Sequence, residues 1–156
     1  MNPTDTLFWP YILPILEAQK EKNGVTYVNF SDANGMDRMI ADSVSEDIYP
    51  GIFVFRPKYV TKNVNGHLLV AEFQAVIYVW CKPEDNERTD EDAAYTHAET
   101  IATSIIQKLQ HDSRVSKNFL EFDSIHLEPV LYLSADRAFG YEMKFRMGLA
   151  ANQMFC

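Results

Sequence analysis

Four histidines are the residues of this sequence best suited to metal binding or proton transfer, and they form no motif. They are His67, His97, His111 and His126. Zinc sites place His or Cys ligands at short, characteristic spacings, and none of the four has a partner at such a spacing. Glu99 lies two positions after His97, and residues two apart on a helix do not share a face. The histidines therefore predict no metal site.

Serines and cysteines give equally little support to nucleophilic catalysis. None of Ser43, Ser104 and Ser124 lies in the Gly-x-Ser-x-Gly pattern of a nucleophile elbow. Cys81 lies in a strongly apolar run, where a thiol is usually buried and unreactive, and Cys156 is the last residue. This pair of cysteines indicates neither a disulfide framework nor a metal box, and a reducing cytosolic setting is the default. We expect a protein that is not an enzyme and that binds no cofactor.

Charge excludes further classes of function. The acids between Glu84 and Asp92 do not have the spacing of a calcium loop, and they indicate a solvated linker followed by the acidic first turn of a helix. Glycines stand singly beside turn residues, so no phosphate-binding loop is indicated. The formal net charge of -8 at pH 7 argues against affinity for a DNA backbone, because phosphate binding requires Lys and Arg.

The clearest structural pattern lies near the C-terminus. Residues 139–149 alternate strictly between apolar residues and polar residues or glycine, which predicts a half-buried β-strand. Residues 119–122 and 125–133 are two further strand candidates, followed by a turn at 134–138. Before them, a main helix is predicted to start at Thr89 or Asp90, with a loop at 111–117. Its apolar stripe consists of Ala94, Ala98, Ile101, Ala102, Ile105 and Leu109.

A long β-hairpin is predicted in the middle of the chain. Two β-rich runs, 52–62 and 68–82, flank the dipeptide at 65–66, and Asn-Gly is a strong hairpin signal because both positions favour positive φ. Centring the turn there places Tyr59 opposite Glu72 and Phe53 opposite Tyr78. Pro57 must lie at an edge or a bulge. The second arm is almost entirely apolar, which predicts that a helix covers one face and that another subunit or the chain itself covers the other.

The N-terminal third predicts two helices and a short strand. The first helix, capped by Thr4 or Asp5, runs to 23–24, a strand follows at 25–30, and a brief helix covers 36 to about 47. The apolar run at 7–16 is too short to span a bilayer, so we expect no membrane anchor.

These elements together predict an α+β fold. We expect a mainly antiparallel sheet with a long β-hairpin, one main helix packed on the sheet, an N-terminal helix and a short extra helix. The length of 156 residues fits one domain, 1–156, with the hairpin projecting near 52–82.

The order of these elements resembles that of the tail terminator and head-to-tail joining proteins of long-tailed bacteriophages. The likeness rests on loose phrases: YPGIFVF at 49–55, FQAVIYVWC at 73–81, AAYTHAETIATSIIQKL at 93–109 and ADRAFGYEMKFRMGL at 135–149. The resemblance implies a virion protein, assembled in the bacterial cytoplasm, whose copies form a hexameric ring. The implied partners are further copies of the chain, the tail tube protein, and neck, connector or sheath proteins. DNA passes through the channel of such a ring without specific binding.

Exposed character and aromatic content suggest which residues contact a neighbouring subunit. Apolar groups near both ends could dock on adjacent copies, and the hairpin supplies aromatic residues and a turn. The candidate interface residues are Trp9, Tyr11, Phe53, Phe55, Tyr59, Asn65, His67, Trp80, Met154 and Phe155.

A second hypothesis is a small acidic cytosolic binding or inhibitor protein that engages a basic partner or imitates DNA. Acids gathered on one face would favour it, whereas acids dispersed around a channel would favour the ring; the relevant residues are Asp32, Asp37, Asp42, Glu46 and Asp47, together with the acids of 85–92. An enzyme acting on a small molecule is the third hypothesis, and it requires a deep pocket with convergent polar groups.

Overall fold

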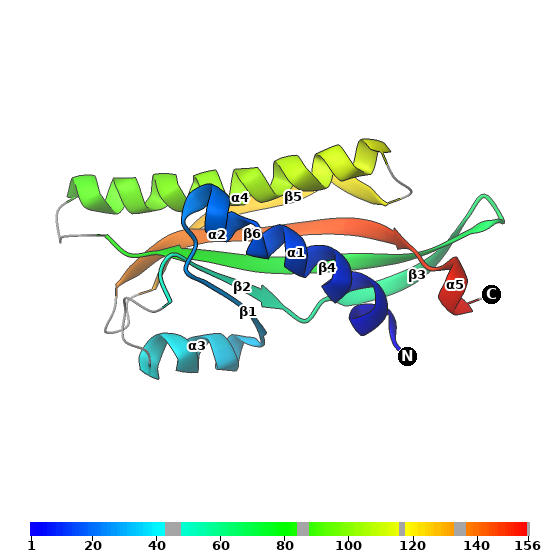
Figure 1. Cartoon of the computed structure of the whole chain (residues 1–156), viewed down its shortest axis with the longest axis horizontal. Coiled ribbons are helices and arrows are strands. Elements are labelled where there is room, and N and C mark those ends of the chain that lie inside the picture. The colour runs from blue at the N-terminus through cyan, green and yellow to red at the C-terminus, as the bar shows by residue number, and fades with distance from the viewer. Residues whose placement is uncertain (43–47, 84–87, 116–117, 133–136, 156) are drawn as a thin grey trace.

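One mixed sheet with helices on both faces forms the body of the protein, as a computed structural model shows (Figure 1). The structure describes residues 1–42, 48–83, 88–115, 118–132 and 137–155. Within these residues, six strands form one sheet in the order β1-β2-β4-β6-β5, and β3 pairs with β4 beside this path. Only β1 and β2 are parallel to each other. The predicted α+β class and mainly antiparallel sheet are confirmed.

Strands β4 (Leu68–Cys81) and β6 (Ala138–Ala150) form the centre of the sheet. They pair without interruption from Val70 opposite Ala150 to Cys81 opposite Phe139. The alternation predicted for 139–149 is confirmed, because Met143, Phe145 and Met147 are buried while Lys144 and Arg146 are exposed. The apolar residues of β6 thus face the core, and the charged residues that alternate with them face the opposite side of the sheet.

Helix α4 (Arg88–Val115) lies along one face of this sheet (Figure 1). The residues of the predicted apolar stripe are all buried beneath it. The loop predicted at 111–117 is wrong over 111–115, where the helix continues. No glycine or proline interrupts this stretch, and Asp112 is fixed there by Lys108 at 2.9 Å and by Tyr11 at 3.0 Å.

The N-terminal segment packs beside α4 as a π-helical turn, η1 (Thr4–Phe8), followed by α1 (Trp9–Glu17) and α2 (Gln19–Asn23). The predicted cap at Thr4 or Asp5 is wrong, because the Asn2 side chain accepts the bond from the Asp5 amide at 2.9 Å. The helix ends as predicted at Gly24, whose φ of 69° suits glycine. Buried Gln19 then ties α2 to α4 by donating to Ser104.

Helix α3 (Ala33–Asp42) lies on the face of the sheet opposite α4 (Figure 1) and connects β1 (Tyr27–Ser31) to β2 (Gly51–Phe55). It closes a second core in which Met36 and Ile40 pack with Phe53 and Trp80. The last part of the helix predicted to reach about 47 lies outside the described residues. The chain itself therefore covers one end of this second face.

The hairpin joins β3 (Lys58–Val64) to β4 and extends past the end of the sheet, beside the C-terminus (Figure 1). The turn residues Asn65 and Gly66 have φ of 60° and 71°, so the predicted positive φ values are confirmed. Because Val64 pairs with Leu68, the loop holds residues 65–67 and is one residue longer than predicted.

That extra residue changes the register of β3. Tyr59 lies opposite Phe73, so the pairing predicted with Glu72 is wrong by one position. The predicted pair of Phe53 with Tyr78 is confirmed, because it belongs to β2. Arg56 and Pro57 lie between β2 and β3, where the register against β4 changes by one residue. This position agrees with the expectation that Pro57 lies at an edge or a bulge.

Strand β5 (Phe119–Tyr132) runs along the far side of β6 as one element, although two strands were predicted. Its register shifts between Glu121, opposite Arg146, and His126, opposite Lys144. Residues 122–125 thus form a bulge within one strand, and this bulge explains the gap in the sequence pattern. The turn predicted at 134–138 lies largely outside the described residues. A final short helix, α5 (Asn152–Phe155), follows β6.

Candidate interaction surface

The residues with potential chemistry do not converge on one site. Among the described residues, no group of three or more His, Cys, Asp and Glu side chains could hold a metal ion. His97 is engaged by the Asn23 carbonyl oxygen at 2.9 Å. Cys81 is buried in the core, and desolvation raises the pKa of its thiol to about 12. At neutral pH this thiol is protonated and therefore a poor nucleophile.

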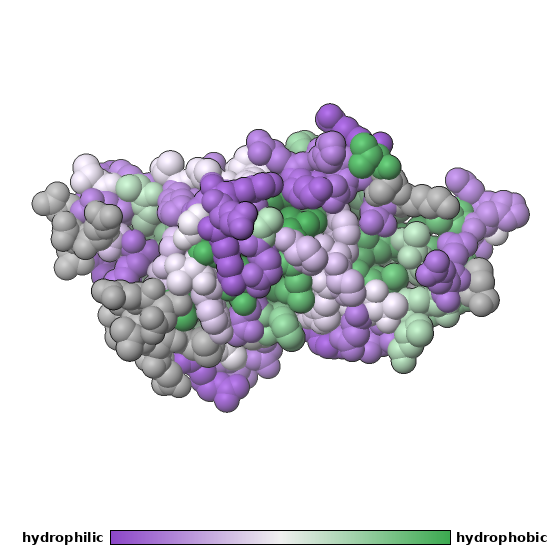
Figure 2. All heavy atoms as spheres, in the orientation of Figure 1, coloured by the Kyte–Doolittle hydropathy of each residue, from purple (hydrophilic) through white to green (hydrophobic). Residues whose placement is uncertain are grey.

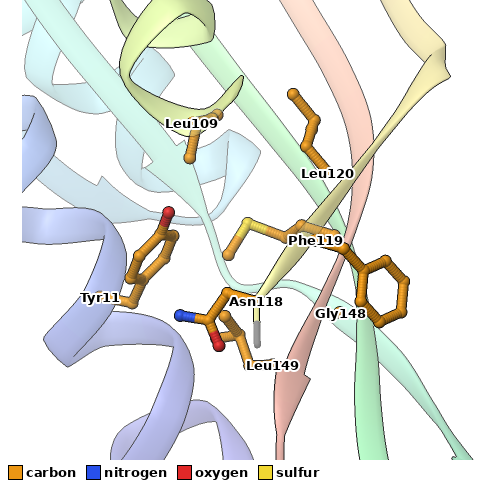
Figure 3. Close-up of a pocket in the computed structure, with 8 residues that line it drawn as sticks. Tyr11, Leu109, Asn118, Phe119, Leu120, Gly148 and Leu149 are labelled. Carbon is orange, nitrogen blue, oxygen red and sulfur yellow. The ribbon is translucent and has the colours of Figure 1, made fainter. Parts of the chain in front are cut away.

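A small cavity lies where α1, the end of α4, β5 and β6 meet (Figure 3). Tyr11 and Leu109 form one wall, and the ring of Phe119 lies on the far side of the strands, over Gly148. The cavity has room of about 10 Å³, roughly what one water needs. Burial and the bond from its hydroxyl to Asp112 raise the pKa of Tyr11. The cavity is a packing feature at a helix–sheet junction and is too small for a substrate.

Two candidate interface residues, Trp9 and Tyr59, belong to one row of aromatic rings. Trp9 contacts Phe8 at 5.0 Å between ring centroids, Phe8 contacts Phe73 at 5.1 Å, and Phe73 contacts Tyr59 at 5.4 Å. The inner members, Phe8 and Phe73, are fully buried, while Tyr59 is 41% exposed. The row connects the N-terminal helix to the hairpin and presents an aromatic surface at its hairpin end.

The structure brings the predicted hairpin-tip and C-terminal residues together. The Asn152 side chain donates to the His67 carbonyl oxygen at 2.8 Å and accepts from the Leu69 amide at 2.9 Å. The Ala151 amide adds a bond to the Leu69 carbonyl oxygen at 2.7 Å. Helix α5, which contains Met154 and Phe155, thus docks against the base of the turn at His67 and Leu69. Asn65 is exposed in the same turn.

Three aromatic candidates of the hairpin lie instead on the side that α3 covers. Phe53 is fully buried and Trp80 is 2% exposed, so the expectation that these two contact a neighbouring subunit is wrong. They fill the protomer's own second core. Phe55 is partly buried against this core, with its ring 5.2 Å from that of Tyr78. The aromatic run of the hairpin is mainly a packing signal.

Beyond α3, no helix of the described residues covers the sheet face opposite α4, and this face carries charges. We call this surface the open face; its members include Lys58, Gln74, Glu121, Lys144 and Arg146, of which all but Glu121 are exposed. Cross-strand ion pairs run over it: Lys62 with Glu72 at 2.5 Å and Arg146 with Glu121 at 2.9 Å. Lys144 pairs with Glu142 at 3.2 Å along β6.

Glu72 is the least exposed acid in this row, at 5%. Burial alone raises the pKa of a carboxyl, but the hydrogen bonds with Glu121 and Lys62 and the charges of Lys62 and Arg146 outweigh it here. The pKa of Glu72 is therefore lowered, and the carboxylate remains charged near neutral pH.

Sequence reasoning missed the open face. The charged parity of β6 was visible, but the acids and bases that meet it come from β3, β4 and β5, and their meeting depends on register. The one-residue error at Tyr59 places the wrong side chains opposite one another, because a slip of one position exchanges the two faces of a strand. The open face could have been found by also considering a three-residue loop at 65–67, because that loop gives the observed register of β3.

The surface seen in Figure 2 is mostly hydrophilic, with apolar area gathered along α1 and toward the hairpin. No helix in the described part of the chain is both long and apolar enough to cross a membrane. No family model matches the chain, and no curated protein gives a significant match to it.

Proposed function

We propose that this chain is a structural virion protein of a long-tailed bacteriophage, a tail terminator or neck-joining subunit that forms a ring on the tail tube. The element order that suggested this family is supported by the order found in the fold: N-terminal helix, strand, short helix, hairpin, long helix and two closing strands. Fold order is an argument by analogy, so the proposal rests mainly on a physical feature of the sheet.

The observation that carries the proposal is that the sheet has long unpaired borders on its two sides. In the described residues, β3 pairs only with β4, and β5 pairs only with β6. An exposed strand edge presents free backbone donors and acceptors, and proteins usually cover or blunt it. Neighbouring copies in a ring would cover both borders at once, because each copy then contributes one border to each neighbour.

Charge supports a passive role toward DNA. The formal net charge is -8, and Lys62, Lys144 and Arg146 of the open face are paired with carboxylates. A channel with this character repels a DNA backbone, so DNA slides through it. In this proposal the ring, a hexamer in the family it resembles, contacts the tail tube protein on one side and neck, connector or sheath proteins on the other.

The decisive experiment measures the solution mass by light scattering at several concentrations, with negative-stain imaging of the same samples. A parallel sample contains purified tail tubes of a long-tailed bacteriophage. The proposal expects closed rings in solution or at the ends of the tubes. A monomer that leaves the tubes bare would contradict it.

That negative result would favour the small acidic binding protein that engages a basic partner. The described acids give this alternative limited support, because Asp32 precedes α3 and Asp90, Glu91 and Asp92 begin α4, on opposite faces of the sheet (Figure 1). The remaining acids of that hypothesis, Glu46, Asp47, Asp85 and Glu87, lie outside the described residues. The side chains of Asp37 and Asp42 do too.

A further inference from the structure

The two long borders of the sheet differ in charge. Strand β3 carries Lys58 and Lys62 and no acid, whereas β5 carries Glu121, Asp123 and Glu128 and no Lys or Arg. The short border strand β1 carries no charged residue. A chain with a basic border on one side and an acidic border on the other is complementary to a second copy of itself.

These charges also share one face of the sheet. Lys58 lies opposite Gln74, Gln74 opposite Arg146, and Arg146 opposite Glu121. Directly opposed residues in paired strands point to the same side, so Lys58 and Glu121 both belong to the open face. Lys62 shares the parity of Lys58 in β3. Glu128 lies opposite Glu142, which shares the parity of Arg146 in β6, so the bulge brings Glu128 to the open face as well.

Spacing along the two borders matches as well. Lys58 and Lys62 are separated by four positions of β3. Glu121 and Glu128 lie opposite Arg146 and Glu142, which are likewise four positions apart on β6, because the bulge removes the extra residues from the register. The two glutamates on the β5 border are therefore spaced along the sheet at the same interval as the two lysines on the β3 border.

Of the four charges Lys58, Lys62, Glu121 and Glu128, two have no ion-pair partner among the described residues. Glu128 lies directly opposite Glu142, a like-charge pair that is unfavourable across two strands. Lys58 lies opposite the neutral Gln74. In the described part of the chain, neither Lys58 nor Glu128 forms an ion pair. Each is exposed and available to a neighbour.

We propose that β3 of one copy pairs with β5 of the next, so that the sheets of neighbouring copies join edge to edge; this interface rests on the proposed ring. Within the sheet β3 is antiparallel to β4, β4 to β6, and β6 to β5, so β3 and β5 run in opposite directions. A ring axis inclined to the strands preserves these directions, so the junction is antiparallel. Lys58 and Glu121 lie in one row across the sheet, so an offset of four residues along the strands between neighbouring copies places Lys58 beside Glu128 and Lys62 beside Glu121.

The geometry of the contact favours closure over an isologous dimer. The two borders are different surfaces, so the contact is head to tail and closes into a ring when the rotation permits. Exposed apolar side chains accompany the charges, with Val60 50% exposed on β3 and Phe122 61% exposed in the bulge of β5. Each copy buries both borders, which doubles the contact area per subunit.

Charge reversal at the two unpaired positions tests this interface. We expect Lys58→Glu and Glu128→Lys each to reduce the fraction of rings about tenfold at a concentration where the original chain is assembled. The double variant, which exchanges the two charges, should recover most of the rings. Lys22→Glu and Glu21→Lys on α2 are matched controls, because they change net charge equally at exposed positions away from both borders.

Hydrogen exchange provides a second measurement on the same samples. Assembly should protect amides of β3 and β5, while amides of β1 exchange as they do in the monomer. Rings that survive both single reversals, without new protection in β3 and β5, would overturn this interface and leave the proposed function standing. Absence of rings for the original chain, both alone and with tail tubes, would overturn both.

Discussion

Glu72 shows how a single buried carboxylate organises the open face. It lies on a central strand, is almost completely buried, and contacts Lys62 from β3 while Arg146 and Glu121 approach from β6 and β5. Residues of four strands therefore depend on one charge. Its type was visible in the sequence as a rare polar residue in an apolar arm, but its partners were not, because they are set by register.

We expect Glu72→Gln to lower the free energy of unfolding by about 1–2 kcal/mol at neutral pH, since an amide cannot replace a charged acceptor for Lys62. Urea titration measures this change. Glu21→Gln, at an exposed helix position, is the control and should change the free energy of unfolding by less than about 0.5 kcal/mol. Equal effects of the two substitutions would contradict the role given to Glu72.

The same carboxylate contributes to the pH dependence of stability. Its pKa is lower in the folded chain than its usual value of 4.5, so the unfolded chain binds the proton more readily. The stabilisation is present above that usual value and is lost as pH falls through the folded pKa. Thermal melts between roughly pH 6 and pH 3 should therefore decline less steeply for Glu72→Gln than for the original chain. Parallel declines would refute this assignment.

At the scale of elements, hydrophobic periodicity predicted the helices and strands well. The errors lay at the ends of elements and at interruptions within them. The strand at 139–149 and the apolar stripe of α4 needed only their own alternation or spacing. The end of α4 was missed because polar residues such as His111 and Asp112 resemble a loop, although the helix continues there and the Asp112 side chain accepts hydrogen bonds from Tyr11 and Lys108. The bulge in β5 resembled a break between strands because it interrupts the alternation.

The docking of α5 was also beyond local patterns, because it joins residues far apart in the chain. We expect Asn152→Ala to leave the Leu69 amide without its acceptor and to cost about 1 kcal/mol. Hydrogen exchange of the Leu69 amide should become faster, whereas Gln153→Ala, a neighbouring exposed position, should leave it unchanged. Unchanged exchange in Asn152→Ala would show that α5 does not hold the hairpin base.

For the molecule as a whole, the sequence predicted charge but not its distribution. The acidic balance was evident from composition, whereas the gathering of cations on one sheet face, with Lys62, Lys144 and Arg146 each beside an acid, required the register of four strands. Phe53 and Trp80 show the same limit for apolar residues, because composition cannot separate a core aromatic from an interface aromatic.

This distribution predicts that the protein does not retain duplex DNA at about 0.15 M salt. Two exposed cations of the open face, Lys144 and Arg146, are engaged by Glu142 and Glu121. A variant with both Glu142→Gln and Glu121→Gln should acquire weak binding that disappears as salt is raised. An electrophoretic mobility assay measures both. A DNA shift by the original chain would contradict the prediction.

The position of β6 between β4 and β5 has a consequence for the order in which the chain is made. On a ribosome, the apolar β4 emerges long before β6, its partner over most of its length. Until β6 emerges, the nascent chain holds β4 with one side unpaired, a state prone to associate with other strands. Emergence of β6 is therefore the step that allows the sheet to close, and any border offered to another copy takes its shape only after that step.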